Sequence, residues 1–106
     1  MQIDIQTREL MLSETLRTHI ERRLQFALSR FQARELRITV CLSSVGSTGA
    51  ALHCHLHIRV EGRPDIFIED TEADIHVAIN RAVDRAGRTL ERQRLHGHLN
   101  SQFQRG

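Results

Sequence analysis

The fold is decided by residues 36–60, in the middle of the chain, which read LRITVCLSSVGSTGAALHCHLHIRV. Apolar residues alternate with polar or small ones twice, first at even positions from Leu36 to Leu42 and again from Leu52 to Val60. Such period-two alternation is typical of strands that bury only one side. Between them, Ser43–Gly49 is rich in Ser and Gly and predicts a flexible loop. The stretch therefore predicts two strands that share a buried side.

Two further strands are predicted outward from this pair. After a tight turn at Glu61–Arg63, Pro64 opens a strand that runs from Asp65 to Glu69. A proline at the first residue of a strand is typical of a sheet edge, because it cannot donate to a neighbouring strand. At the start of the chain, residues 1–6 also alternate between apolar and polar. The sequence thus predicts four strands in all.

The first helix is predicted between the first two strands. Ser13 is a suitable N-cap, and apolar residues then recur every three or four positions, which defines one side of a helix. We expect this helix to end near residues 32–34. Its apolar side consists of Leu16, Ile20, Leu24, Ala27 and Phe31.

The second helix is predicted after the last strand. Thr71 with Asp74 three residues later resembles a capping box, so the helix is expected from Glu72 to about His96. Gly97 is a suitable C-terminal stop, and residues 97–106 form a short polar tail. The expected core side of this helix consists of Ile75, Ile79, Ala82, Val83, Ala86 and Leu90.

These elements predict an α+β fold in the order βαβββα. The last three strands have short connections and form an antiparallel meander, whereas a helix joins the first two, which allows them to run parallel. The simplest packing places both helices on one face of the four-stranded sheet. Since 106 residues suffice for only one core, residues 1–96 are predicted to form a single domain.

Composition narrows the function classes. No run approaches the ~20 apolar residues of a membrane span, and no signal pattern opens the chain. The two cysteines are too few for a disulfide framework, which favours a cytoplasmic protein.

All 15 basic residues are Arg. Residues 61–74 hold one Arg and six acidic residues, whereas residues 75–106 hold six Arg and two acidic residues. This segregation predicts a bipolar surface with a basic region suited to a polyanion.

The basic residues of the second helix suggest a phosphate-binding row. Arg81, Arg85, Arg88 and Arg92 are spaced by four, three and four residues, so they fall within about 60° of one another around a helix. Guanidinium groups in such a row are suited to bind successive phosphates of a polyanion. On the first helix, Arg23 and Arg30 share a flank with His19 and Phe26 and extend the basic surface if the helices are neighbours. The alternative is that both flanks are simply solvated.

The alternating histidines of the third strand suggest a second kind of site. His53, His55 and His57 point to the same side, and Cys41 is expected on the neighbouring strand. Imidazole and thiolate groups at such spacing supply metal ligands, but an exposed, His-rich face is the simpler interpretation. Cys54 alternates with the apolar residues and is expected to be buried. No catalytic constellation, cofactor motif or small-molecule site is evident, so the chain is not expected to be an enzyme.

Two stretches of the sequence, the opening MQIDI and residues 74–94, DIHVAINRAVDRAGRTLERQR, match the pattern of a known family. In these stretches the chain resembles the bacterial ribosome hibernation factors, the family that includes hibernation promoting factor and protein Y and is also labelled sigma factor modulation proteins. The family pattern there is Asp, then Ala-Ile, then Asp followed by a basic residue, then Arg-x-Leu and further basic residues. The resemblance covers about residues 1–95 and includes the βαβββα order.

The resemblance implies a function for the basic residues. Members of the family bind the small ribosomal subunit at the decoding region and silence ribosomes in stationary phase or stress. The family's RNA-contacting positions match Arg85, Arg88, Arg92 and Arg94 on the second helix and Arg23 on the first; Arg81 belongs to the same row. The chain is expected to be a short form without the C-terminal dimerisation domain of long members. We therefore expect the small subunit and its ribosomal RNA as partners, and neither a cofactor nor a membrane.

Two alternative functions come from other classes. Two helices on an antiparallel sheet also describe a double-stranded-RNA-binding module, which would act away from the ribosome, although acidic Glu72 and Asp74 stand where its second helix should begin with Lys. The other alternative is a metal-binding domain that uses His53, His55 and His57.

Overall fold

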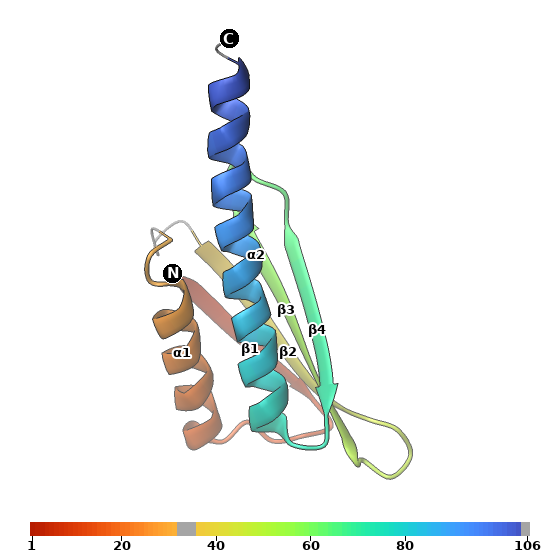
Figure 1. The fold of residues 1–106 in the computed structure, drawn as a ribbon. Helices are drawn as coiled ribbons and strands as arrows, with labels where there is room; N and C mark the ends of the chain where they lie inside the picture. The colour runs from red at the N-terminus through yellow and green to blue at the C-terminus, as the bar shows by residue number, and fades with distance from the viewer. Residues whose placement is uncertain (32–35, 105–106) are drawn as a thin grey trace.

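The computed structural model describes residues 1–31 and 36–104, with side chains as far as Leu95. It has the predicted α+β architecture, shown in Figure 1. The elements, in chain order, are β1 (Gln2–Arg8), α1 (Glu14–Leu28), β2 (Leu36–Val45), β3 (Ala51–Val60), β4 (Ile66–Glu72) and α2 (Ile75–Gln104).

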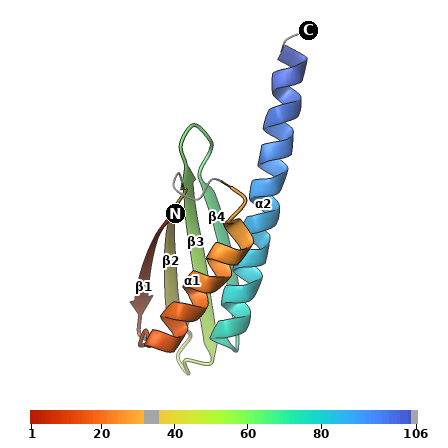
Figure 2. The same cartoon turned by 90° about the vertical axis from the view of Figure 1, so that its left-hand side faces the viewer.

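The four strands form one sheet in the order β1-β2-β3-β4. β1 runs parallel to β2, as expected for strands joined through a helix, and β2, β3 and β4 are antiparallel neighbours. β4, which follows Pro64, lies at the edge of the sheet as predicted. Both helices lie side by side on one face of the sheet, as Figure 2 shows edge-on. Within residues 1–31 and 36–104, no helix lies on the other face.

One core lies between the helices and the covered face of the sheet. Strand alternation aims the even-numbered residues of β2, β3 and β4 inward, as the sequence predicts. Each fully buried Leu or Ile contributes about 1.5–3 kcal/mol to folding. The buried residues are Leu16, Ile20, Leu24, Leu28, Leu36, Ile38, Val40, Leu42, Cys54, Leu56, Ile58, Ile66, Ile68, Ala78, Ile79, Ala82, Val83, Ala86 and Leu90.

The boundaries of α1 differ partly from the prediction. Ser13 is the N-cap, and its hydroxyl accepts a hydrogen bond from the backbone N–H of Leu16 at 3.1 Å. The predicted end near residues 32–34 is wrong, because the helix ends at Leu28; residues 32–35 themselves lie outside the described part. Leu28, four residues after Leu24, occupies the core position that the prediction gave to Ala27, which is only partly buried.

The start of α2 also differs from the prediction. β4 continues to Glu72 because its residues pair with β3, and Thr71 lies opposite His53 in that ladder. Asp74 caps the helix instead: its carboxylate accepts from the backbone N–H of His76 at 2.8 Å, and its carbonyl accepts from the N–H of Ala78 at 3.1 Å. The capping box predicted at Thr71 is therefore wrong.

The predicted end of α2 near His96 is also wrong. The helix continues through Gly97 to Gln104, beyond the end of the sheet (Figures 1 and 2). A single helical glycine costs only about 1 kcal/mol relative to alanine, which does not stop a long helix that began in a packed core.

Candidate nucleic-acid interface

The four arginines of the predicted row lie on one exposed side of α2. The opposite side is buried against the sheet through Ile79, Val83 and Leu90. This separation follows from the helical period of 3.6 residues, and it confirms the prediction that the row points away from the core. The exposed residues of the row are Arg81, Arg85, Arg88 and Arg92.

Two members of the row are already neutralised by the edge strand. Arg81 Nη1 lies 3.3 Å from Glu72 Oε1. Arg85 Nη1 donates to the Glu69 carbonyl at 2.8 Å and lies 3.9 Å from Asp70 Oδ2. Acidic residues of β4 and arginines of α2, which are separated along the sequence, therefore lie next to each other in the fold. The separation of positive and negative charge predicted for the surface is smaller there.

The other two members of the row have no such partner. Among the described residues, no carboxylate lies within 4.0 Å of the Arg88 or Arg92 side chain. Their guanidinium groups keep their full charge and their hydrogen-bond donors for a ligand. A planar guanidinium with free donors is suited to bidentate contact with phosphate.

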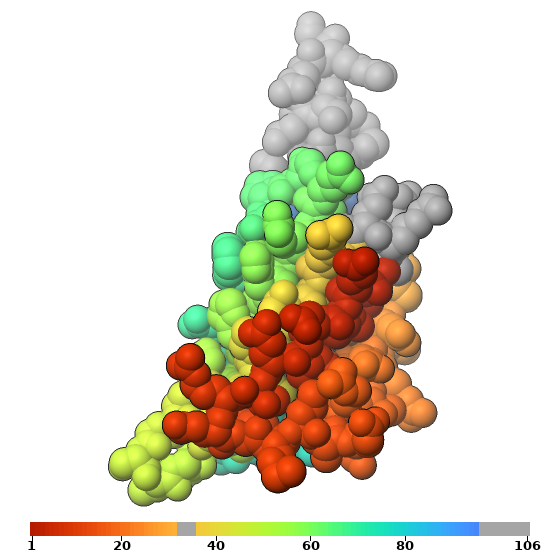
Figure 3. Space-filling model, turned by 180° about the vertical axis from the view of Figure 1, so that it is seen from behind, coloured from red at the N-terminus to blue at the C-terminus, as the bar shows by residue number. Residues whose placement is uncertain are grey.

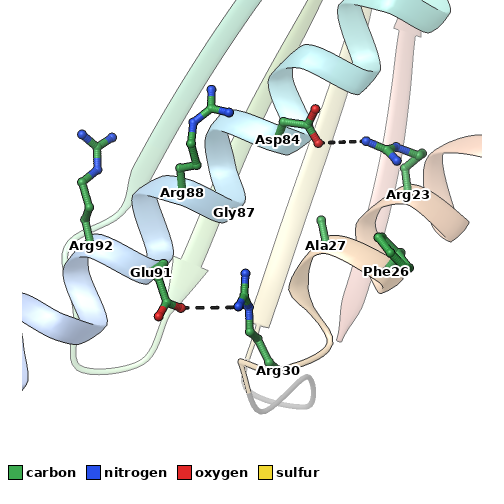
Figure 4. A pocket seen from close by; sticks show the side chains of 9 residues that line it. All are labelled: Arg23, Phe26, Ala27, Arg30, Asp84, Gly87, Arg88, Glu91 and Arg92. Atoms are coloured by element: carbon green, nitrogen blue, oxygen red, sulfur yellow. Dashed lines mark hydrogen bonds and ion pairs between the residues drawn. The ribbon is translucent and has the colours of Figure 1, made fainter.

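Arg88 and Arg92 border an open groove of about 600 Å³ between α1 and α2. Figure 4 shows its walls, and the lining residues are Arg23, Phe26, Ala27, Arg30, Asp84, Gly87, Arg88, Glu91 and Arg92. The helices come close at its floor, since a Cβ added to Gly87 would lie 3.7 Å from the carbonyl oxygen of Ala27. At that distance an alanine would make an ordinary van der Waals contact, so the packing of the two helices does not require a glycine at this position.

Two ion pairs join the walls of the groove. Arg23 Nη2 donates to Asp84 Oδ1 at 2.8 Å, and Arg30 Nε lies 4.0 Å from Glu91 Oε2 (Figure 4). The two arginines predicted beside the second helix therefore do lie next to it, but each is paired with a carboxylate of α2. With four guanidinium groups against two carboxylates, the groove keeps an excess of positive charge.

Arg94 is not part of this row. Its Nη2 donates to Glu91 Oε1 at 2.6 Å. This hydrogen bond, assisted by the charges of Arg94 and Arg30, holds the pKa of Glu91 below its ordinary value. Arg94 therefore reaches the groove only through Glu91.

The helical spacing of α2 does not predict that carboxylates line the groove. Asp84 and Glu91 lie outside the arc of the arginine row, and they become relevant only because α1 packs beside α2. Phe26 is the other unexpected feature of this wall, since its side chain is 81% exposed. By helical spacing Phe26 belongs to the flank of α1, where no role was predicted for it.

The histidines lie on the open face of the sheet, which Figure 3 shows with the four strands side by side. Each ring is directed to a different partner on or before β4. His53 Nδ1 is 2.8 Å from Thr71 Oγ1, His55 Nε2 is 3.9 Å from Glu69 Oε1, and His57 Nε2 is 2.9 Å from Asp65 Oδ2. Within the described residues, no three metal-binding side chains converge. The arrangement favours an exposed polar face over a metal site.

The two cysteines occupy different environments. Cys54 is fully buried, as predicted, and burial, assisted by the negative charge of Asp70, raises the pKa of its thiol to about 12. Cys41 is half-buried on the open face, where its Sγ lies 3.7 Å from Gln6 Oε1.

The chain is similar to a known protein family and to solved structures. Residues 3–95 match the family model described as Sigma 54 modulation protein / S30EA ribosomal protein. No relative was found among curated proteins. The N-terminal domain of Protein Y from Thermus thermophilus is similar in structure, with a TM-score of 0.75, 29% identity, and coverage of 87% of this chain and 98% of that one.

A second solved structure shares the fold. It is a ribosomal subunit interface protein from Coxiella burnetii, with a TM-score of 0.73, 15% identity, and coverage of 90% of this chain and 99% of that one.

Within the described part of the chain, no helix combines the length and hydropathy that crossing a bilayer requires. Proteins of the matched family are ribosome-associated factors rather than enzymes, in agreement with the prediction. By its match over residues 3–95, the chain belongs to the Sigma 54 modulation protein / S30EA ribosomal protein family.

Proposed function

We propose that this protein is a cytoplasmic ribosome hibernation factor that binds the small ribosomal subunit near its decoding region. There it excludes messenger and tRNA and inhibits translation under stress. Two observations support the proposal together. One is membership of a family of ribosome-associated factors, and the other is the pair Arg88 and Arg92, which lies beside a basic groove without a carboxylate partner among the described residues. The pair carries the proposal, because its guanidinium groups line the groove and have no carboxylate partner among the described residues.

Within this proposal, the arginines contribute unequally to RNA binding. Arg88 and Arg92 bind ribosomal RNA phosphates without giving up an ion pair to any described residue. Arg23, Arg81 and Arg85 must first share or release a carboxylate, since each is already ion-paired. Phosphate contacts supply affinity and salt dependence, while the fit of both helices into an RNA groove supplies selectivity for one site.

Displacement of tRNA tests the proposed place of binding. Labelled initiator tRNA is bound to purified small subunits with messenger, and the protein is added in increasing amounts. The proposal predicts that the wild-type protein displaces tRNA and that R88A/R92A requires a much higher concentration to do so.

The matched control for this experiment is R37A/R59A. It removes the same number of charges from exposed residues that lie opposite each other in β2 and β3, on the open face of the sheet. This control is expected to displace tRNA as the wild type does. Binding of the wild-type protein to small subunits without loss of tRNA would refute a position at the decoding region.

A further inference from the structure

We infer that Phe26 is a stacking platform for an unpaired RNA base, and that the groove between α1 and α2 receives one single-stranded nucleotide. The inference rests on the proposed function, because the nucleotide belongs to RNA of the small subunit. It adds a recognition element that does not depend on charge.

The first argument is the exposure of the ring. Phe26 is 81% exposed, on the side of α1 that faces away from the core. The other phenylalanines with described side chains have partners: Phe31 packs against the core with Arg30 above its ring at 5.5 Å, and Phe67 is stacked on His57 at 4.5 Å. Within the described residues, the Phe26 ring contacts no other aromatic ring and no cation over its face. Its exposed apolar surface is therefore available to a ligand.

The second argument is the charge around the ring. Arg23 lies one helical turn before Phe26, Arg30 lies in the turn that follows α1, and all three line the groove (Figure 4). Arg88 and Arg92 line the same groove from α2, without carboxylate partners among the described residues. A flat π-face bordered by guanidinium groups matches a nucleotide, which joins a flat base to an anionic phosphate.

The surroundings favour a base over an apolar side chain of a protein partner. Apart from Ala27 and Gly87, the residues that line the groove beside Phe26 are charged. An apolar peptide anchor needs an apolar pocket, whereas a base needs one flat face and tolerates a polar rim. Bases in a duplex are already stacked on each other, so the ligand must be single-stranded.

Substitution of Phe26 gives the first test. Binding to purified small subunits is measured over a salt series for wild type, F26A and F26L, where leucine keeps an apolar side chain but removes the π-face. Loss of one stacked base is expected to weaken binding by about 5- to 150-fold. The slope of log affinity against log salt is expected to stay unchanged, because stacking releases no counterions. F26L is expected to lose nearly as much as F26A.

The matched control is F67A, which removes the other phenylalanine that is exposed among the described side chains, 62% exposed on the open face of the sheet. This variant is expected to bind as the wild type does. The inference is overturned if F26A binds small subunits as tightly as the wild type, or if F67A is weakened equally. Because Phe26 lies outside the core, F26A and F26L are expected to keep the wild-type melting temperature.

A fluorescent reporter tests the stacking directly and separates this inference from the proposed function. The chain has no Trp, so F26W introduces a single indole. An oligoadenylate decamer is expected to quench its emission, whereas tripolyphosphate and oligoglutamate are not. If the decamer causes no quenching, or oligoglutamate causes the same quenching, the inference fails. If the wild type does not bind small subunits but the decamer quenches F26W, the proposed function fails and the stacking site stands.

Discussion

Replacement of Arg88 and Arg92 by alanine is predicted to weaken binding to the small subunit far more than replacement of Arg81 and Arg85. The reason lies in their partners. The first two are unpaired among the described residues, whereas Arg81 and Arg85 are 3.3 and 3.9 Å from carboxylate oxygens of Glu72 and Asp70. A paired guanidinium gains less from a phosphate, because it has to share or release its carboxylate.

The magnitude follows from counterion release. Each phosphate contact contributes about 0.7–0.9 to the slope of log affinity against log salt. Relative to 1 M salt, one contact at 0.1 M then strengthens binding about 5- to 8-fold, and two contacts about 25- to 60-fold. R88A/R92A should therefore lose about 25- to 60-fold in affinity at 0.1 M salt and about 1.4–1.8 in slope. R81A/R85A should lose less than half of that slope.

The assay is equilibrium binding of labelled protein to purified small subunits, from about 0.05 M to 0.5 M salt. R37A/R59A controls for the change in net charge and should retain the wild-type slope. R81A/R85A also removes the contact of Arg85 to the Glu69 carbonyl, so a stability loss of about 1 kcal/mol is expected and is checked by thermal unfolding. An unchanged slope in R88A/R92A, or an equal loss in R81A/R85A, would refute the reasoning.

Three further predictions concern stability and reactivity. G87A should raise the melting temperature by a few degrees, because alanine gains about 1 kcal/mol in a helix and its Cβ would lie at an ordinary contact distance of 3.7 Å; a lower melting temperature would mean that the helices lack that space. At pH 8, a thiol reagent should modify Cys41 readily and Cys54 only in denaturant, since burial raises the pKa of Cys54 to about 12; equal rates for both thiols would contradict this. The hydrogen bond from Arg94 lowers the pKa of Glu91 in the folded state, so its stabilisation is present above 4.5, the ordinary pKa, and is lost as pH falls through the folded value. Thermal unfolding of E91Q should therefore depend less on pH than that of wild type in this acid range, and identical profiles would exclude the contribution of Glu91.

The sheet and its buried face were predictable because alternation has period two. A one-residue error would move every side chain of a strand to the wrong face, so the pattern over residues 36–60 leaves little freedom. The core side of α2 was equally clear, and five of the six predicted positions are fully buried, with Ile75 partly buried. Which side of a strand or helix is buried depends on that element and the core it packs against, so a local sequence pattern is sufficient to predict it.

Element ends and ion-pair partners were not predictable in the same way. Thr71 is a good helix cap by residue type, but pairing with His53 across the ladder keeps it in β4. The arginine row follows from helical spacing, yet the pairing of Arg81 with Glu72 and of Arg23 with Asp84 depends on how elements pack. Tertiary packing therefore determines which members of the row remain free for a ligand, and only the structure distinguishes Arg88 from Arg85.

The central claim is that this protein binds the small ribosomal subunit through a salt-sensitive basic surface. Sedimentation of the purified protein with separated small and large subunits, at about 0.1 M and 0.5 M salt, tests it most directly. The account predicts that the protein sediments with the small subunit at the lower salt and largely dissociates at the higher one. Absence from the small subunit at the lower salt, or equal sedimentation with both subunits, would contradict it.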